Sequence, residues 1–155
     1  MKLRTALLGA AASLVFAPAA FAERGSDGNV NIIYWQAVST LNPYLSSGTK
    51  DVESASLVVE PLAGFNEKGE VIARLAAEVP TVENGGVAPD LTSITWKLKP
   101  GLLWSDGTPV TSADVVFSAN YCMNPDGGCA QLARYEGIKT VEAIDDLTIK
   151  ISYNE

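Results

Sequence analysis

Two segments of the chain alternate strictly between apolar and polar residues. Residues 94–99 read Ile-Thr-Trp-Lys-Leu-Lys, and residues 147–153 read Leu-Thr-Ile-Lys-Ile-Ser-Tyr. Because successive side chains of a β-strand point to opposite faces of a sheet, each pattern predicts a strand with one buried face and one face in water. The second segment follows residues 141–144 across Asp145 and Asp146, so residues 141–144 and 147–153 predict a hairpin.

The clearest helix start in the sequence lies at Thr111. Thr111 and Asp114 have the spacing of a capping box, in which each side chain accepts a hydrogen bond from the other residue's backbone N–H. The sequence therefore predicts a helix that begins after Thr111 and continues through Phe117 and Tyr121.

Three more elements are predicted upstream. Residues 30–35 are a short β-branched and aromatic run, which predicts a buried strand. A helix is predicted from Thr49, which is placed to cap it, to Glu60, because Pro61 disfavours helical geometry in the residue before it. Residues 62–65 and 71–72 flank a turn that contains glycine and predict a second hairpin. Helices and strands are thus mixed along the chain.

The first 22 residues differ in composition from the rest. Lys2 and Arg4 precede an apolar run, and Ala20-Phe21-Ala22 is the small-x-small pattern that signal peptidase recognises. The apolar run is too short for a membrane span, which needs about 20 apolar residues. We therefore predict a Sec-like signal peptide that is cleaved after Ala22, a periplasmic location, and no membrane insertion after cleavage.

The ionisable residues argue against several classes of function. The chain has 155 residues, with 11 Lys and Arg, 18 Asp and Glu, a formal net charge of −7 and no histidine. Nucleic-acid binding needs clustered Lys and Arg, so we expect no nucleic-acid partner. Without histidine there is no Ser-His-Asp or Cys-His nucleophile and no His-ligated metal. We expect no catalytic residues, no metal site and no cofactor.

The two cysteines are Cys122 and Cys129. An exported protein meets an oxidising compartment, in which a disulfide is the natural state of such a pair. The Pro, Asp and Gly residues between them can turn the chain back within a few residues. Six intervening residues fit neither a CxxC redox motif nor a usual metal site, so a structural disulfide is the favoured interpretation.

Several motifs now stand in a recognisable order. They are Leu41-Asn42-Pro43, the segments 60–65 and 69–76, the hairpin 141–150 and, most specific of all, the block 94–117. This order resembles the peptide/nickel class of extracellular solute-binding proteins, family 5, which feed ABC importers. The resemblance covers essentially the whole chain after residue 22.

The resemblance implies both a fold and a function. The fold is a mixed α/β fold of the type II periplasmic-binding-protein kind, as the N-terminal portion of a longer, two-lobed protein. Its expected parts are the signal peptide 1–22, the start of the first lobe with its first strand at 23–45, and most of the family's extra α/β domain at 46–155. The implied function is non-enzymatic capture of a peptide or similar small solute for delivery to inner-membrane ABC permease subunits. Peptides, nickel complexes, oligosaccharides and opines all occur as solutes in this class.

The resemblance also suggests solute contacts after the first strand. In family members, the loop after the Leu-Asn-Pro turn borders the ligand cleft. Here that loop contains Ser46, Ser47, Gly48 and Thr49. Ser and Thr hydroxyls donate and accept hydrogen bonds, Gly48 lets backbone approach a ligand, and amides at a helix start favour a carboxylate. From the residues alone, an ordinary N-capping loop explains the same pattern.

Three further residues complete the candidate set. Trp35 and Gln36 end the predicted first strand, and strand ends are where ligands usually bind in open α/β sheets. Arg134 and the neighbouring Tyr135 would supply charge and stacking from the second domain, although a surface Arg-Tyr pair is the commoner explanation.

Two other classes of function stay open at this stage. A secreted hydrolase lacks support because the chain has no histidine and no Gly-x-Ser-x-Gly motif, but composition does not exclude a Ser/Lys or paired-carboxylate enzyme. The other alternative is a small extracytoplasmic interaction domain.

Overall fold

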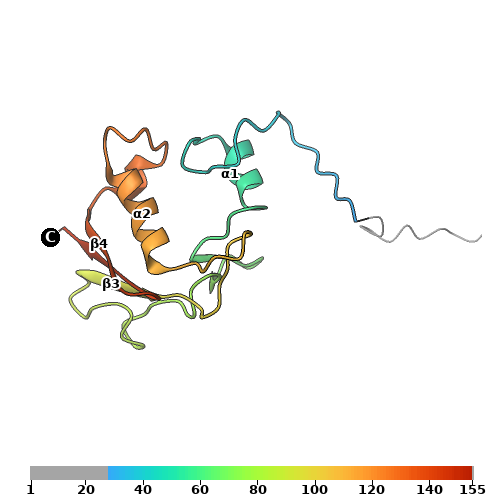
Figure 1. Cartoon of the computed structure of the whole chain (residues 1–155). Coiled ribbons are helices and arrows are strands. Elements are labelled where there is room, and N and C mark those ends of the chain that lie inside the picture. The colour runs from blue at the N-terminus through green and yellow to red at the C-terminus, as the bar shows by residue number, and fades with distance from the viewer. Residues whose placement is uncertain (1–27, 155) are drawn as a thin grey trace, which may run out of the picture. The chain divides into compact units, whose positions relative to one another are not determined.

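The computed structural model describes residues 28–154 (Figure 1). The chain divides into two units, residues 1–33 and 34–155, and each is described by itself. Of the first unit, residues 28–33 are described, and all of them are exposed and irregular. The predicted signal peptide, residues 1–22, lies outside the described residues.

The second unit contains two helices, five strands and one 3₁₀ helix among its described residues. In chain order they are α1 (Thr49–Ala55), β1 (Ala63–Phe65), β2 (Val71–Ala73), β3 (Ser93–Lys97), α2 (Ser112–Met123), η1 (Leu132–Tyr135), β4 (Ile138–Asp145) and β5 (Thr148–Tyr153). Helices and strands are mixed along the chain, as the sequence predicts.

The described strands form two antiparallel sheets. β1 and β2 make the predicted hairpin, and β3, β5 and β4 make a three-stranded sheet in that order. In the larger sheet Trp96 pairs with Ile149 and Ile94 pairs with Ile151, so the two alternating segments of the sequence lie side by side in register. The predicted C-terminal hairpin is confirmed, with β4 beginning at Ile138, three residues before the predicted start at Val141.

The core lies between α2 and the three-stranded sheet. α2 crosses one face of the sheet (Figure 1) and contacts β4 and β5. The buried centre consists of Leu98, Ala119, Val141 and Ile149, and Trp96 and Ile151 pack against it. The two alternating segments supply Trp96, Leu98, Ile149 and Ile151 from their apolar faces. Val141 of β4 and Ala119 of α2 complete the cluster, so burial of these side chains joins the helix to the sheet.

The start of α2 agrees with the sequence. Thr111 is the N-cap, and Thr111 and Asp114 form the predicted capping box. The backbone N–H of Thr111 donates to the Asp114 carboxylate at 2.7 Å. The hydroxyl of Ser112 donates to the backbone carbonyl of Asp145, which ties the first turn of α2 to the end of β4.

The predicted strand at residues 30–35 is wrong. Residues 30–34 have no regular structure, and Val30, Ile33 and Trp35 are 79%, 97% and 65% exposed. A strand needs a neighbour that satisfies its backbone N–H and C=O groups. None of the strands that the structure describes pairs with this segment. Residues 30–35 therefore have the β-branched composition of a strand but belong to no sheet among the described residues.

α1 differs from its prediction at both ends. Its N-cap is Gly48, with extended backbone, and Thr49 is the first helical residue. The helix ends at Ala55, because the amides of Ser56, Leu57 and Val58 bond three residues back, to Glu53, Ser54 and Ala55. This tighter pattern closes a helix, and the chain then leaves the helical path before Pro61.

The predicted disulfide is present. Cys122, in the last turn of α2, is joined to Cys129, with 5.0 Å between the two Cα atoms. Both cysteines are buried. The bridge holds the segment that leads into η1 against the end of α2.

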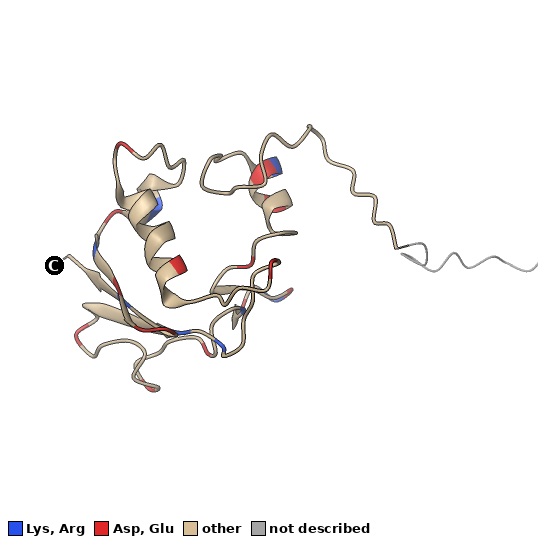
Figure 2. Ribbon diagram, viewed as in Figure 1, with Lys and Arg blue, Asp and Glu red and all other residues tan. Residues whose placement is uncertain are grey.

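Charged residues are spread over the unit. Figure 2 shows Lys and Arg on α1, near η1 and along the strands, interspersed with Asp and Glu. Within residues 28–154, no helix is long and apolar enough to span a bilayer.

Candidate functional site

The carboxylate of Asp51 is the centre of the segment around the start of α1. Asp51 is 2% exposed, and its oxygens accept hydrogen bonds from the Ser39 amide and the Ser46 hydroxyl, both at 2.7 Å. The ammonium of Lys50 donates to the same carboxylate at 2.9 Å. Hydrogen bonds from the Ser39 amide, then from Lys50 and Ser46, hold the pKa of Asp51 well below its ordinary value of 3.8.

The predicted loop Ser46–Thr49 lies directly against this carboxylate. The Gly48 amide donates to the Ser46 hydroxyl oxygen at 3.1 Å, and that hydroxyl donates to Asp51. A Cβ atom on Gly48 would lie 3.3 Å from the Ser46 oxygen, which is a tight approach. Ser46 and Gly48 are half-buried, whereas Ser47 and Thr49 are exposed. Asp51 therefore supplies a negative charge at the start of α1 from within the chain, and the outward-facing members of the loop are Ser47 and Thr49.

The side chain of Gln131, which is distant in the sequence, holds the same loop. Its side-chain amide donates to the backbone carbonyls of Pro43 at 3.3 Å and Ser46 at 3.0 Å. The neighbouring backbone amide of Ala130 donates to the carbonyl of Tyr44 at 2.8 Å. These bonds join segments separated by 85 or more residues, so the loop is fixed on both sides.

Arg134 lines an open cavity of about 520 Å³ between α1 and η1. The cavity wall is partly apolar and partly aromatic, because Tyr44, Val52, Val59 and Tyr135 line it together with Arg134. Burial raises the pKa of Tyr135, and the neighbouring Tyr44 hydroxyl raises it further, so the Tyr135 phenol stays neutral. The structure brings Arg134 together with Tyr44, but residues 46–49 do not line this cavity.

Trp35 and Gln36 lie on the irregular segment before the loop. Trp35 is 65% exposed, and its ring contacts that of Tyr34 with centroids 5.5 Å apart. Gln36 is exposed as well. Neither residue lines the cavity that contains Arg134. The candidate residues thus form three separate groups: the loop, the cavity and the exposed segment.

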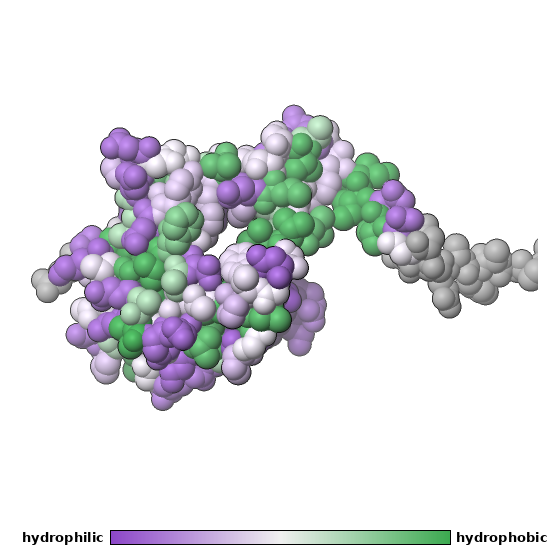
Figure 3. Space-filling model, viewed as in Figure 1, coloured by the Kyte–Doolittle hydropathy of each residue, from purple (hydrophilic) through white to green (hydrophobic). Residues whose placement is uncertain are grey.

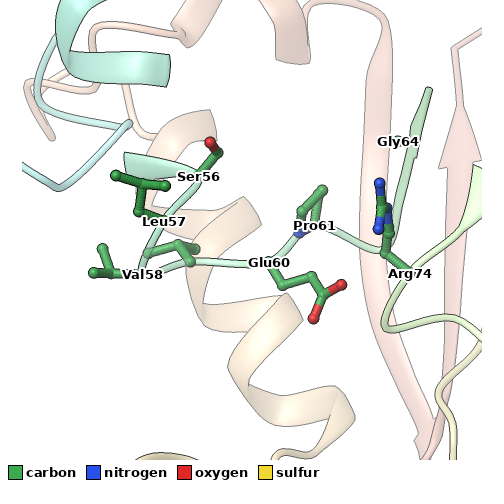
Figure 4. Close-up of a pocket in the computed structure, with 8 residues that line it drawn as sticks. Ser56, Leu57, Val58, Glu60, Pro61, Gly64 and Arg74 are labelled. Atoms are coloured by element: carbon green, nitrogen blue, oxygen red, sulfur yellow. The ribbon is translucent and has the colours of Figure 1, made fainter. Parts of the chain in front are cut away.

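A second hollow, of about 540 Å³, follows the end of α1. Figure 4 shows Leu57 and Val58 at one end, Arg74 at the other, and Glu60 and Pro61 between them. Leu57 and Val58 are each 62% exposed. In the space-filling view, apolar surface gathers beneath α1 (Figure 3). This stretch of chain therefore presents side chains of the kind that folded proteins usually bury.

Metal binding finds no support in the part of the chain that the structure describes. No three Cys, Asp or Glu residues gather within reach of one ion between residues 28 and 154.

Sequence reasoning missed Asp51, Gln131 and Tyr44 as members of this region. Asp51 carries only the weak signal of an acid in a helix's first turn, which any exposed acid would satisfy. Gln131 and Tyr44 carry no local signal, because their partners lie far away in the sequence. The Asn42-Pro43 sequence indicates that the chain turns here, but it does not identify the segment that the turn contacts.

Comparison with known proteins identifies the family of the chain. Residues 70–155, more than half of the chain, match the family described as bacterial extracellular solute-binding proteins, family 5 Middle. The matched range contains β2, the three-stranded sheet, α2 and the disulfide.

Individual relatives agree with this match. The chain is 28% identical over 114 residues to the glutathione-binding protein GsiB of Pectobacterium atrosepticum, covering 74% of this chain and 21% of that protein. It is 29% identical over 110 residues to the periplasmic murein peptide-binding protein MppA of Escherichia coli K12, covering 70% of this chain and 19% of that protein. Among solved structures, MoaA of A. tumefaciens R10 in complex with mannopinic acid is 30% identical, with a TM-score of 0.65, covering 76% of this chain and 24% of that chain.

The chain spans about a fifth of the length of the curated relatives it matches. Its mixed helix-and-sheet fold is that of the matching portion of type II periplasmic binding proteins, as the resemblance implies. The chain belongs to the bacterial extracellular solute-binding proteins of family 5.

Proposed function

We propose that the protein is the periplasmic substrate-binding component of an ABC importer. It captures a peptide or similar small solute and presents it to permease subunits in the inner membrane. The observation that carries this proposal is the family match over residues 70–155. The names of the relatives GsiB and MppA, a glutathione-binding and a murein peptide-binding protein, favour a peptide-like solute.

We assign three parts to the chain in this function. Residues 1–22 are the signal peptide, removed after Ala22, which delivers the protein to the periplasm. Residues 23–45 begin the first lobe, and residues 46–155 make up most of the extra α/β domain.

The exposed loop residues are the proposed solute contacts. Ser47 and Thr49 offer hydroxyls, and Gly48, which has no side chain, lets a bound solute approach the loop closely. The backbone amide and carbonyl of Gly48 are already bonded within the chain. Ser46 acts mainly within the chain, because its hydroxyl is bonded to Asp51. Trp35, Gln36 and Arg134 are the remaining proposed contacts and would offer an indole face, an amide and a guanidinium, although they lie in groups separate from the loop.

The protein acts by binding, without chemical change of the solute. The Asp51 carboxylate accepts hydrogen bonds from a backbone amide, a hydroxyl and an ammonium and is almost unexposed. These surroundings favour a structural role for Asp51 over a role in proton transfer to a solute. An assay of ester and peptide hydrolysis by the purified protein tests this point, and turnover that scales with protein concentration would contradict it.

A transport assay tests the proposed function directly. The gene is deleted, and uptake of radiolabelled trialanine and glutathione is measured in the deletion strain, with and without a plasmid copy of the gene. We expect uptake of at least one of the two to fall in the deletion strain and to return with the plasmid. Unchanged uptake of both, with no peptide bound by the purified protein, would overturn the proposal.

A further inference from the structure

The loop around Ser46 depends on residues that follow the disulfide. Three donors from residues 130 and 131 reach the carbonyls of Pro43, Tyr44 and Ser46. Without these donors, each of the three carbonyls would lose this hydrogen bond. An unpaired carbonyl in partly buried surroundings is unfavourable.

Gln131 suits this task for a chemical reason. Its amide group carries two N–H donors on one nitrogen, and two carbonyl oxygens, 3.0 and 3.3 Å away, accept from that nitrogen. The side chain is half-buried, so water competes only in part for these bonds. Methionine has similar length and no donor, and glutamate has similar shape and only acceptors at neutral pH.

The backbone of Gln131 is fixed from both directions along the chain. Gln131 is the N-cap of η1, and its carbonyl accepts from the Arg134 amide at 2.9 Å. Two residues earlier, Cys129 is bridged to Cys122 in α2, which packs on the sheet. A continuous path therefore runs from the sheet through α2 and the disulfide to Gln131 and then to the loop.

We propose that Gln131, anchored by the Cys122–Cys129 disulfide, is a positioning residue for the solute-contacting loop Ser46–Thr49. The part of this inference that concerns solute rests on the proposed function. The disulfide stabilises the unit and also sets the place of a loop whose residues lie more than 70 positions earlier in the sequence. Gln131 acts through the carbonyls of that loop rather than by touching the solute.

Hydrogen exchange tests the positioning without any ligand. Exchange is followed at the amides of Leu45, Gly48 and Ala130, which bond to Asn42, Ser46 and Tyr44, in Gln131→Met, Gln131→Glu and Gln131→Arg. Glu136→Gln, an exposed neighbour, is the matched control, and the amides of β5 report global opening. We expect about tenfold faster exchange at the three loop-linked amides in Q131M and Q131E, with β5 unchanged. Q131R, which retains N–H donors, restores protection.

The double variant Cys122→Ala, Cys129→Ala supplies the second arm. It should accelerate exchange at the same three amides, and Q131M added to it should have little further effect, because the two changes interrupt one path. Unaltered loop exchange in Q131M would overturn the proposal even if the cysteine variant does not fold. Acceleration by an equal factor in β5 would also overturn it, because the effect would then be general destabilisation.

A binding measurement separates this inference from the proposed function. The Kd of the complete protein for trialanine and for glutathione is measured in wild type, Q131M and Q131R. We expect weaker binding in Q131M and recovery in Q131R. If the loop loosens in Q131M but wild type binds neither probe, the positioning stands and its role in binding these solutes fails. If the loop loosens in Q131M and Q131M still binds as tightly as wild type, the proposal that Gln131 positions the loop for solute is overturned.

Discussion

Asp51 joins three stretches of backbone through one carboxylate. It takes hydrogen bonds from Ser39 before the turn, from Ser46 in the loop and from Lys50 in its own helix. Hydrogen bonds to an ionised acceptor are stronger than neutral ones. At 2% exposure the carboxylate has little contact with water, so these donors must replace its hydration. Asp51 therefore links Ser39, the loop and the start of α1 to one another.

The first prediction concerns Asp51→Asn. The amide keeps the shape of the side chain but loses the charge and turns a donor toward Ser46 or Lys50. We expect a lower melting temperature and faster hydrogen exchange at the amides of Ser39 and Gly48. Glu53→Gln, on the exposed side of the same helix, is the control and should leave both quantities unchanged. Equal effects of the two substitutions would show that Asp51 has no special role.

The second prediction concerns acid. The pKa of Asp51 is lowered in the folded state, so the unfolded state binds the proton more readily. The stabilisation is complete above the ordinary carboxyl pKa of 3.8 and is lost as pH falls through the lower folded value. The gap between the melting temperatures of wild type and D51N, constant from pH 7 to about pH 4, should narrow progressively as pH falls from there to pH 2. A constant gap in melting temperature across that range would contradict this account.

Among the elements, α2 is the one that the sequence predicts best, because its start depends on two residues three positions apart. Its third-position acid accepts from the Thr111 amide at 2.7 Å. We predict that Asp114→Ala lowers the free energy of unfolding by about 1 kcal/mol. Urea denaturation followed by circular dichroism measures it, with Asp126→Ala, an exposed acid of the disulfide loop, as the control. A loss no larger than that of D126A would mean that the capping box contributes nothing.

The disulfide yields a prediction for the junction of α2 and η1. Its two cysteines are seven positions apart, and closing so short a loop is worth about 2–3 kcal/mol in the chain-entropy model. Cys122→Ala, Cys129→Ala should lower the free energy of unfolding by that amount in urea denaturation, with dithiothreitol having no further effect on the variant. Wild type treated with the reductant should approach the same value. A stability indistinguishable from oxidised wild type would contradict the structural role of the bridge.

The strands show where sequence patterns succeed and fail. The alternating segments 94–99 and 147–153 become neighbouring strands, because each buries an apolar face on the same core. The hairpin of β1 and β2 follows from its short turn. Residues 30–35 have the composition of a strand but not its structure, since a strand also requires a partner and composition cannot supply one.

For the whole unit, the functional region is less predictable than the fold. The sequence singles out Ser46–Thr49 and Arg134 through a family resemblance, and the structure puts them in different surroundings, one against Asp51 and one in the cavity of α1 and η1. What connects the two regions is Gln131, whose partners are 85 and 88 residues away. Such long-range pairs leave no local pattern, so they become visible only after the chain has folded.

We propose that this family 5 protein binds a peptide-like solute. The most direct measurement is isothermal titration of the complete, purified protein with glutathione and with a defined set of di- and tripeptides. We expect saturable one-site binding of at least one of these peptides, weakened when Ser47 and Thr49 are both changed to alanine. No binding of any of them, by protein whose cooperative thermal unfolding shows it to be folded, would contradict the claim.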